Sequence, residues 1–450
     1  MVVQHNMQAA NANRMLNVTT SAQSKSTEKL SSGYRINRAA DDAAGLTISE
    51  KMRKQIKGLD RASTNAEDGV SAVQTAEGAL TEVHSMLQRM NELATQSANG
   101  TNSNTDRQAI QDEIDQLTTE IDRVSETTKF NETYLLKGDG ADKAHNVNAH
   151  DAGLDGVTLT DKGDEVDVTL KTLNAGDKVS IAGKNYTIGA TDADAKKLYD
   201  GVATDGTATV TVNGKAYTVQ DTNPAADKNQ ISKADLDKLV KAGVTVEYNG
   251  KSMTVMDADA NGVDKKDSSV ITAATAYKLE TAEIVKASSI GTDTKAAAGT
   301  LTNNTFTLTK GKVNYNDALS FNLHVGADAD MTNKITVNID SMNSAGLGVK
   351  GIKADTEQDA TYAIDAIADA ISTVSSQRSA LGAVQNRLEH TINNLDNVVE
   401  NTTSAESRIR DTDMAEEMVN YSKNNILAQA GQSMLAQANQ SNQGVLSLLQ

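Results

Sequence analysis

Apolar residues recur at alternating spacings of three and four near both ends of the chain, but not in its middle. Such a repeat is typical of amphipathic helices that pack against one another. One stripe runs through Met52, Ile56, Leu59, Ala66, Val70, Val73, Leu80, Leu87 and Ala94. A second follows at Ile110, Ile114, Leu117, Ile121 and Val124, and a third at Ile364, Ile367, Ile371, Val374, Leu381, Leu388, Ile392, Leu395 and Val399. The pattern predicts three long helices, the first ending near residues 97–103, where Asn and Gly gather.

The first two stripes form a helical hairpin over residues 45–126 that still lacks a partner for its groove. The stripe over 364–399 has no other long helix near it in sequence, so the two ends of the chain are expected to pack together. The predicted fold is mainly α: a long coiled-coil helical bundle made from paired N- and C-terminal segments, with an inserted β-rich α+β outer region. We assign residues 41–139 and 346–404 to the bundle and 140–345 to the insert.

Outside the bundle, residues 1–40 and 405–450 form two further helix-compatible stretches. An amphipathic end helix often only covers its own core. These stretches are interrupted by polar residues such as Asn425, Gln432 and Asn439, however, and are too weakly apolar to hold an isolated hairpin firmly. Residues 1–40 carry five basic groups and one acid, whereas 401–450 carry three basic and five acidic groups, which favours pairing of the ends. We expect both to become ordered when copies of the chain assemble.

The assembly contacts predicted from these stretches are large apolar side chains. They are Leu16, Leu30, Ile36, Met418, Leu427, Met434, Leu435, Leu446, Leu448 and Leu449.

The middle of the chain contains a degenerate repeat with strand-like alternation. It reads VSIAGKNYTI from Val179, VTVNGKAYTV from Val210 and VEYNGKSMTV from Val246. Each copy predicts a strand, a Gly-Lys turn and a strand, and the Asn-Gly pairs are strong hairpin signals. Helix candidates follow around 193–199, 233–242 and 272–278, so the expected architecture is a series of small β-β-α units.

Charge and composition exclude several classes of partner. The formal charge is −17, from 43 Lys and Arg against 60 Asp and Glu, which argues against nucleic acid and anionic lipid. No run of about 18 apolar residues occurs, so no membrane span is expected, and the N-terminus lacks the pattern of a secretory signal peptide. An extracellular location would therefore require a dedicated export apparatus.

No catalytic or metal-binding constellation is predicted, and no cofactor. The six His residues show no metal-ligand spacing, and no nucleophile elbow or phosphate-binding loop is present. The run Asp257-Ala-Asp-Ala-Asn-Gly262 copies the first half of a calcium loop, but Ser268 stands where a bidentate Glu is required. A solvated acidic turn is expected there, with weak calcium binding as the alternative. Asp41-Asp42 is expected to cap the following helix.

Four segments resemble bacterial flagellins, in particular those of Gram-positive gut anaerobes. They are LSSGYRINRAADDAAGLT from Leu30, LQRMNELATQSANGTNS from Leu87, IQDEIDQLTTEIDRVSETTKFNE from Ile110 and ANQSNQGVLSLLQ from Ala438. The resemblance covers roughly the first 138 and the last 95 residues. It departs at Gln450, where many relatives carry a basic residue.

The resemblance implies a structural subunit, not an enzyme, that polymerises with itself into an extracellular filament for motility. The paired ends would line the inner filament and the insert its outer surface. Export through the flagellar type III apparatus, an export chaperone, and filament cap and hook-junction proteins as partners are implied as well. The family's contacts with Toll-like receptor 5 correspond here to Leu87, Gln88, Arg89, Leu93, Gln96 and Glu113. The alternatives are a hook-filament junction protein, or an enzyme or adhesin displayed in the insert.

Overall fold

The structure is a computed structural model that describes residues 6–221, 229–302 and 304–447, with side chains as far as Ser441. The chain divides into two compact units. The terminal unit comprises Met1–Ser71, Asn322–Val337 and Ala383–Gln450, and the central unit comprises Ala72–Phe321 and Asn338–Gly382.

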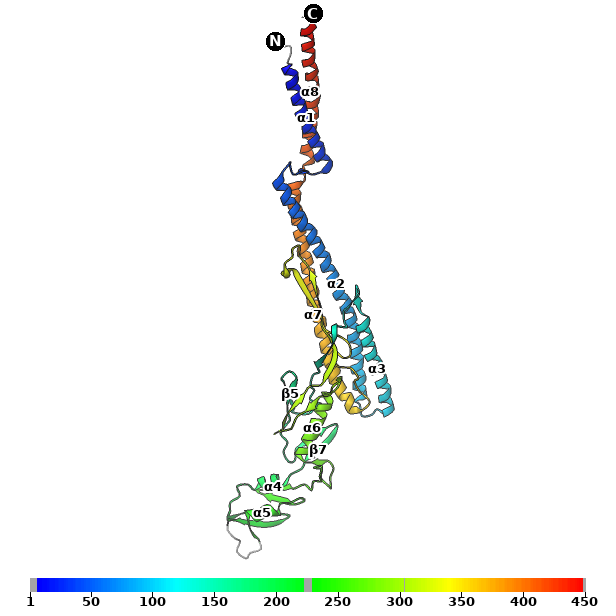
Figure 1. Cartoon of the computed structure of the whole chain (residues 1–450). Coiled ribbons are helices and arrows are strands. Elements are labelled where there is room, and N and C mark those ends of the chain that lie inside the picture. Colours follow the sequence, from blue (N-terminus) through cyan, green and yellow to red (C-terminus); the bar gives the residue numbers. More distant parts are fainter. Residues whose placement is uncertain (1–5, 222–228, 303, 448–450) are drawn as a thin grey trace. The chain divides into compact units, whose positions relative to one another are not determined.

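Helices make up about half of the chain, and most of them belong to its two ends (Figure 1). They are α1 (Met7–Ser32), α2 (Ala43–Ser97), α3 (Asn104–Thr127), α4 (Asp192–Leu198), α5 (Lys233–Leu239), α6 (Ala273–Ala287), α7 (Glu357–Arg410) and α8 (Met414–Ser447), with a 3-10 turn η1 (Met331–Asn333). The predicted long helices and the end of the first at residue 97 are confirmed. A capping box of Ser103 and Asp106 begins α3, because each side chain satisfies the other residue's backbone N–H.

The strands lie mainly in the central unit and form small sheets. One is the five-stranded sheet β10 (Gln230–Ser232), β9 (Lys215–Gln220), β8 (Asp205–Val212), β11 (Thr245–Tyr248) and β12 (Lys251–Thr254). Another is the three-stranded sheet β13 (Val270–Ile271), β7 (Lys184–Ile188) and β6 (Lys178–Ile181). A four-stranded sheet contains β14 (Ala297–Ala298), β15 (Thr305–Thr309), β5 (Glu165–Thr169) and β4 (Thr158–Asp161). The two-stranded pairs are β1 (Lys129–Phe130) with β2 (Thr133–Tyr134), β3 (Asp139–Asn146) with β16 (Lys312–Asp317), and β17 (Leu319–His324) with β18 (Lys334–Ile339).

The predicted repeat hairpins are confirmed. Asn213 and Gly214 have φ of 48° and 77°, and Asn249 and Gly250 have 49° and 74°, as a type I′ turn requires. The predicted short helices are also present, although α6 extends to Ala287, nine residues beyond its predicted end.

Helices α2 and α7 pack along one another in both units, as the apolar stripes of the sequence predict. The buried contact line between packed helices is called their seam below. In the terminal unit Ser63 Oγ donates to Asp396 Oδ1 at 3.2 Å, and Ala66 and Leu388 share a buried cluster. In the central unit Arg378 Nη2 lies 2.9 Å from Glu77 Oε1. The mainly α fold with a strand-rich middle is therefore confirmed.

The hairpin β17–β18 lies inside the range 140–345 that the sequence assigns to the outer insert. Its residues 322–337 nevertheless belong to the terminal unit. Ile335, 3% exposed, packs with Ala66 of α2 and Leu388 of α7. Residues 322–337 of this hairpin therefore pack against the helical bundle. The domain boundaries drawn from the sequence remain a prediction.

Candidate assembly surface

Helices α1 and α8 pack side by side through small and polar side chains (Figure 1). Asn6, which caps α1, also donates a hydrogen bond from Nδ2 to the carbonyl oxygen of Ala438 at 3.2 Å. Lys29 Nζ lies 3.7 Å from Glu417 Oε2. Ser26 and Ala428 are buried. The pair therefore buries little large apolar surface of its own.

Most large apolar side chains of this helix pair point into solvent. Among the described side chains, the exposed ones are Met7 (74%), Met15 (59%), Val18 (60%), Met414 (49%), Met418 (55%), Val419 (68%), Ile426 (67%), Leu427 (48%) and Met434 (62%). A groove of about 660 Å³ runs between the two helices, lined by Met15, Met434 and several Asn, Gln and Ala side chains. Large apolar side chains exposed in this number on two paired helices are characteristic of an interaction site.

The predicted assembly residues divide into three groups. Met418, Leu427 and Met434 are exposed, and Leu16, Leu30 and Leu435 are half-buried. Ile36 is only 2% exposed, so its side chain packs inside the chain and has little surface left for a neighbour. The side chains of Leu446, Leu448 and Leu449 lie outside the described residues. Met15, Val419 and Ile426 are comparable exposed positions that the sequence reading omitted.

The turn between α1 and α2 is held by the segment between α7 and α8. Gly33 ends α1 with φ of 76°, and its carbonyl oxygen accepts from the amide of Thr412 at 3.0 Å. Tyr34 forms an antiparallel bridge with Asp411, and the Arg410 guanidinium lies 4.8 Å from the centre of the Tyr34 ring. These contacts tie the two ends of the chain together at one place.

The neighbouring acidic pair has two different tasks. Asp42 Oδ1 accepts from the amide of Gly45 at 2.9 Å, so Asp42 caps α2 as predicted. Asp41 Oδ2 accepts from the amides of Asn37 and Arg38 and thereby closes the preceding loop. The hydrogen bond from the Arg38 amide lowers the pKa of the Asp41 carboxyl.

The six residues matched to receptor contacts lie on α2 and α3 of the central unit. Gln88, Arg89, Gln96 and Glu113 are exposed, whereas Leu87 (0%) and Leu93 (2%) are buried. The two leucines therefore support this surface from below, and only the four polar residues offer their side chains to a partner.

A charged cluster joins the two helices at this surface. Arg89 Nε donates to Glu113 Oε1 at 2.9 Å, and Arg89 Nη1 lies 3.1 Å from Glu92 Oε2. The hydrogen bond with Glu113 is the main cause of the raised pKa of Arg89. Both partners remain about half exposed, so solvent and salt can reach the pair. The cluster thus presents fixed charge without contributing to the core.

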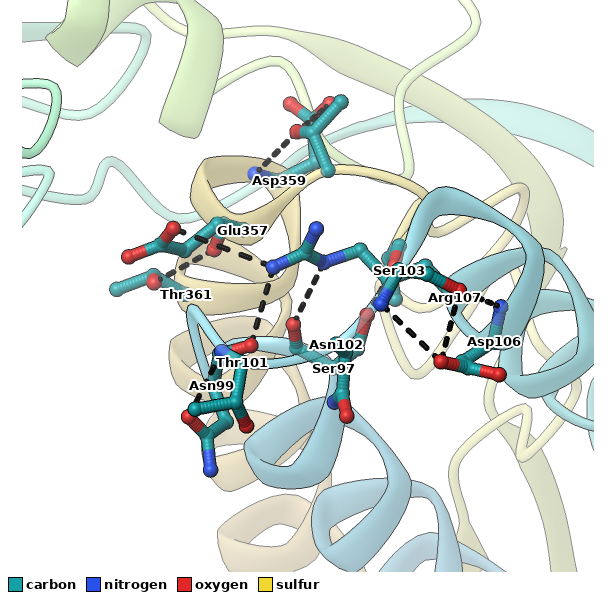
Figure 2. A network of polar contacts seen from close by, with 12 residues as sticks. Ser97, Asn99, Thr101, Asn102, Ser103, Asp106, Arg107, Glu357, Asp359 and Thr361 are labelled. Carbon is teal, nitrogen blue, oxygen red and sulfur yellow. Dashed lines mark hydrogen bonds and ion pairs between the residues drawn. The ribbon is translucent and has the colours of Figure 1, made fainter.

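The turn between α2 and α3 is braced by a buried arginine that the sequence reading missed. Arg107, 7% exposed, donates from Nε to the Ser97 carbonyl oxygen at 2.9 Å and from Nη2 to that of Asn99 at 3.0 Å (Figure 2). Glu357 at the start of α7 lies 4.0 Å from Nη2. The local signal was the Ser103–Asp106 capping box, which places Arg107 in the first turn of α3.

The calcium-like segment uses its oxygens internally. Asp259 Oδ1 accepts from the amides of Asn261 and Val263, and Lys265 Nζ lies 2.9 Å from Asp257 Oδ1. The Val263 amide is the main cause of the lowered pKa of Asp259. Within the described residues no group of three His, Cys, Asp or Glu side chains could hold a metal ion. Nor, over that same part of the chain, is any helix long and apolar enough to cross a membrane.

Comparison with known proteins accounts for both helical ends. The family described as the bacterial flagellin N-terminal helical region matches residues 3–141, and the bacterial flagellin C-terminal helical region matches 364–449. The flagellin of Clostridium tyrobutyricum is 42% identical over 448 residues, covering 98% of this chain and 100% of the relative. That of Bacillus subtilis is 36% identical over 451 residues, covering 100% of both chains. The chain belongs to the bacterial flagellins, which are structural filament subunits and not enzymes.

Two solved structures are more distantly similar. FliC from Burkholderia pseudomallei is 19% identical with a TM-score of 0.24, covering 71% of this chain and 99% of that chain. Flagellar hook associated protein-3 from Legionella pneumophila is 14% identical with a TM-score of 0.32, covering 80% and 98%.

Proposed function

We propose that this flagellin polymerises by burying the exposed apolar side chains of α1 and α8 against neighbouring copies. The observation that carries the proposal is the set of large apolar residues exposed on both helices, including Met15, Ile426 and Met434. Burial of one such side chain contributes about 1.5 to 3 kcal/mol. A filament repeats that contribution at every subunit, so weak pairing within one chain is compatible with a stable polymer.

Truncation tests this proposal. Removing residues 421–450 takes away the exposed part of α8 that contains Ile426, Leu427 and Met434. The truncated protein should keep its α2–α7 bundle, measured by circular dichroism, and fail to form filaments in electron microscopy after salt-induced polymerisation. Truncated protein that forms filaments of normal stability would overturn the proposal. The same experiment on the full chain separates a filament subunit from a hook-filament junction protein, because only a filament subunit propagates.

We propose further that Toll-like receptor 5 recognises the surface around Arg89 and Glu113. Both side chains are exposed and joined by a hydrogen bond, and arginine is enriched among the residues that carry binding free energy in protein interfaces. Leu87 and Leu93 would act by shaping the surface, since both are buried. Binding of purified monomer to the receptor ectodomain is the direct measurement.

Secretion through the flagellar type III apparatus, with α1 and α8 unfolded before assembly, is the third part of the proposal. An export chaperone would cover the apolar residues of α8 in the cytosol, because exposed Met418 and Leu427 would otherwise start polymerisation there. Filament cap and hook-junction proteins are the proposed partners at the filament ends. Hydrogen exchange on monomer should find α1 and α8 unprotected, and strong protection of both would contradict this part.

A further inference from the structure

In each of the three repeat hairpins, the last residue of the repeat pairs with a residue from outside that repeat. The tenth residues of the three copies are Ile188, Val219 and Val255, and they are 2%, 0% and 4% exposed. Each pairs in parallel with one residue of another segment: Ile188 with Ile271, Val219 with Ile231, and Val255 with Ala190. All three hairpins are therefore extended by a parallel segment at the same position.

The residue after each parallel partner caps a helix. Thr272 accepts from the amide of Thr275 and begins α6, Ser232 accepts from that of Asp235 and begins α5, and Thr191 accepts from that of Asp194 and begins α4. The three β-β-α units are thus equivalent in structure: a hairpin, one parallel segment and a capped helix.

Only the second unit is continuous in sequence. Hairpin β8–β9 pairs with β10, and β10 leads into α5. Helix α4 follows the first hairpin in sequence but contacts β11 and β12 of the third. Helix α6 follows the third hairpin but contacts β6 of the first.

The two hydrophobic cores are divided according to which helix packs on which hairpin in space, and not according to sequence order. All members of one buried cluster lie between Ala195 and Val255, including Tyr199, Leu236 and Val246. The members of the other lie on both sides of this range, within 152–188 and 271–308, together with Tyr362. Among the described residues no buried side chain belongs to both clusters, so the two cores are made of different residues.

The two ends of residues 191–255 are next to each other. The amide of Met256 donates to the Ala190 carbonyl oxygen at 2.9 Å, and one step away the Gly189 amide donates to that of Ile271 at 2.9 Å. A segment whose ends meet and whose core is its own has the properties of an inserted domain.

We propose that α4 and α6 have exchanged hairpins within one chain, and that residues 191–255 form an inserted module carried by the connection between β7 and β13. The arrangement is the intrachain counterpart of domain swapping, in which equivalent elements trade places. The module should therefore fold and unfold as its own cooperative unit, and residues outside it should not need it.

Native-state hydrogen exchange on two full-length variants tests the exchange of helices. Ile188→Ala should accelerate exchange in α6 at least tenfold and leave α4 within twofold of the parent, although α4 is the nearer helix in sequence. Val255→Ala should do the reverse, because local opening follows the packed unit. If each substitution instead exposes the helix that follows its own hairpin, or if both expose the two helices equally, the proposal is wrong.

Deletion of the module provides a second measurement, which needs no point substitution in either core. Residues 191–255 are removed, and Ala190 is joined to Met256 through one glycine. Protection of α6 and β5 should stay within twofold of the full chain. Loss of that protection by tenfold or more would show that the two cores depend on one another and would overturn the inserted module.

Discussion

Glu113 Oε1 on α3 accepts a hydrogen bond of 2.9 Å from Arg89 Nε on α2. The pair joins two helices whose buried seam already contains Leu87, Ile110 and Ile114. Its charges are about half exposed and lie outside that seam, so replacing either side chain should leave the seam intact. This separation between core and surface allows binding and stability to be tested independently.

Arg89→Ala should weaken binding of monomer to the Toll-like receptor 5 ectodomain tenfold or more without changing helix content or thermal midpoint. An arginine at a desolvated interface often carries much of the binding free energy, whereas an exposed ion pair contributes little to folding. Arg123→Ala is the matched control, because Arg123 forms a comparable exposed pair with Glu120 elsewhere on α3. Equal binding by the Arg89 variant, the control and the parent would refute the residue-by-residue assignment.

Replacing Leu427 and Met434 by Gln should raise the protein concentration needed for polymerisation at least tenfold. Both side chains are exposed in the single chain, at 48% and 62%, so their loss should not disturb its folding. Met331→Gln is the control, because Met331 is 72% exposed on η1, away from α1 and α8 in the sequence. Light scattering gives the critical concentration. A similar increase in the control would indicate a general solubility effect.

Deletion of the outer region should preserve polymerisation if the bundle keeps its hairpin. Asp142 and Asn316 are cross-strand partners, so residues 143–315 can be replaced by a two-residue Asn-Gly turn that retains β17–β18. A larger deletion of 142–343 removes Ile335 from its place against Ala66 and Leu388, and burial of such a side chain contributes about 1.5 to 3 kcal/mol. The larger deletion should therefore unfold at a lower temperature, measured by circular dichroism. Equal thermal midpoints would show that the hairpin is dispensable.

Arg107→Met should destabilise the α2–α3 turn by about 1 to 3 kcal/mol, because the carbonyl oxygens of Ser97 and Asn99 lose their buried donor. Arg107→Lys should recover only part of the loss, since one ammonium cannot reproduce the fork of the guanidinium. Urea unfolding gives the free energy of unfolding of each variant. Full recovery by lysine would mean that charge alone matters at this turn.

Local patterns in the sequence predicted most of the helical part and the hairpins. The seam positions Leu80, Leu87 and Leu388 are all buried, and Asn213-Gly214 forms the expected turn. The helix faces depend on residues three and four positions apart, and the turn depends on two adjacent residues. Both patterns can be read directly from a single sequence.

Contacts between distant segments could not be predicted in the same way. The pairing of Ala190 with Val255 involves one residue from each side and has no local signal. Arg107 has the residue type of an exposed position, and its burial depends on where the carbonyl groups at the end of α2 fall. Ile36 was assigned to assembly because it is apolar, and only tertiary packing shows that it is covered within the chain.

The spatial equivalence of the β-β-α units also explains an unusual buried carboxyl group. Glu280 lies eight residues after the cap Thr272, as Tyr199 lies after Thr191 and Val240 after Ser232. All three positions are buried, with Glu280 6% exposed. Its Oε2 has no hydrogen-bond partner among the described residues, and burial raises the pKa of the Glu280 carboxyl to about 7 from an ordinary 4.5.

Glu280→Gln should therefore stabilise the core around α6 at pH 8 and have a much smaller effect at pH 5. Below about pH 4.5 the carboxyl is protonated in both states and costs nothing by ionisation. Between about pH 4.5 and 7 the unfolded chain releases the proton first, so the free energy of unfolding falls with rising pH, and the loss is complete above the folded pKa. The shift corresponds to about 3 kcal/mol. Hydrogen exchange in α6 measures the effect, with the exposed Glu247→Gln as control. A stabilisation that is equal at pH 5 and pH 8 would show that ionisation of Glu280 is not its cause.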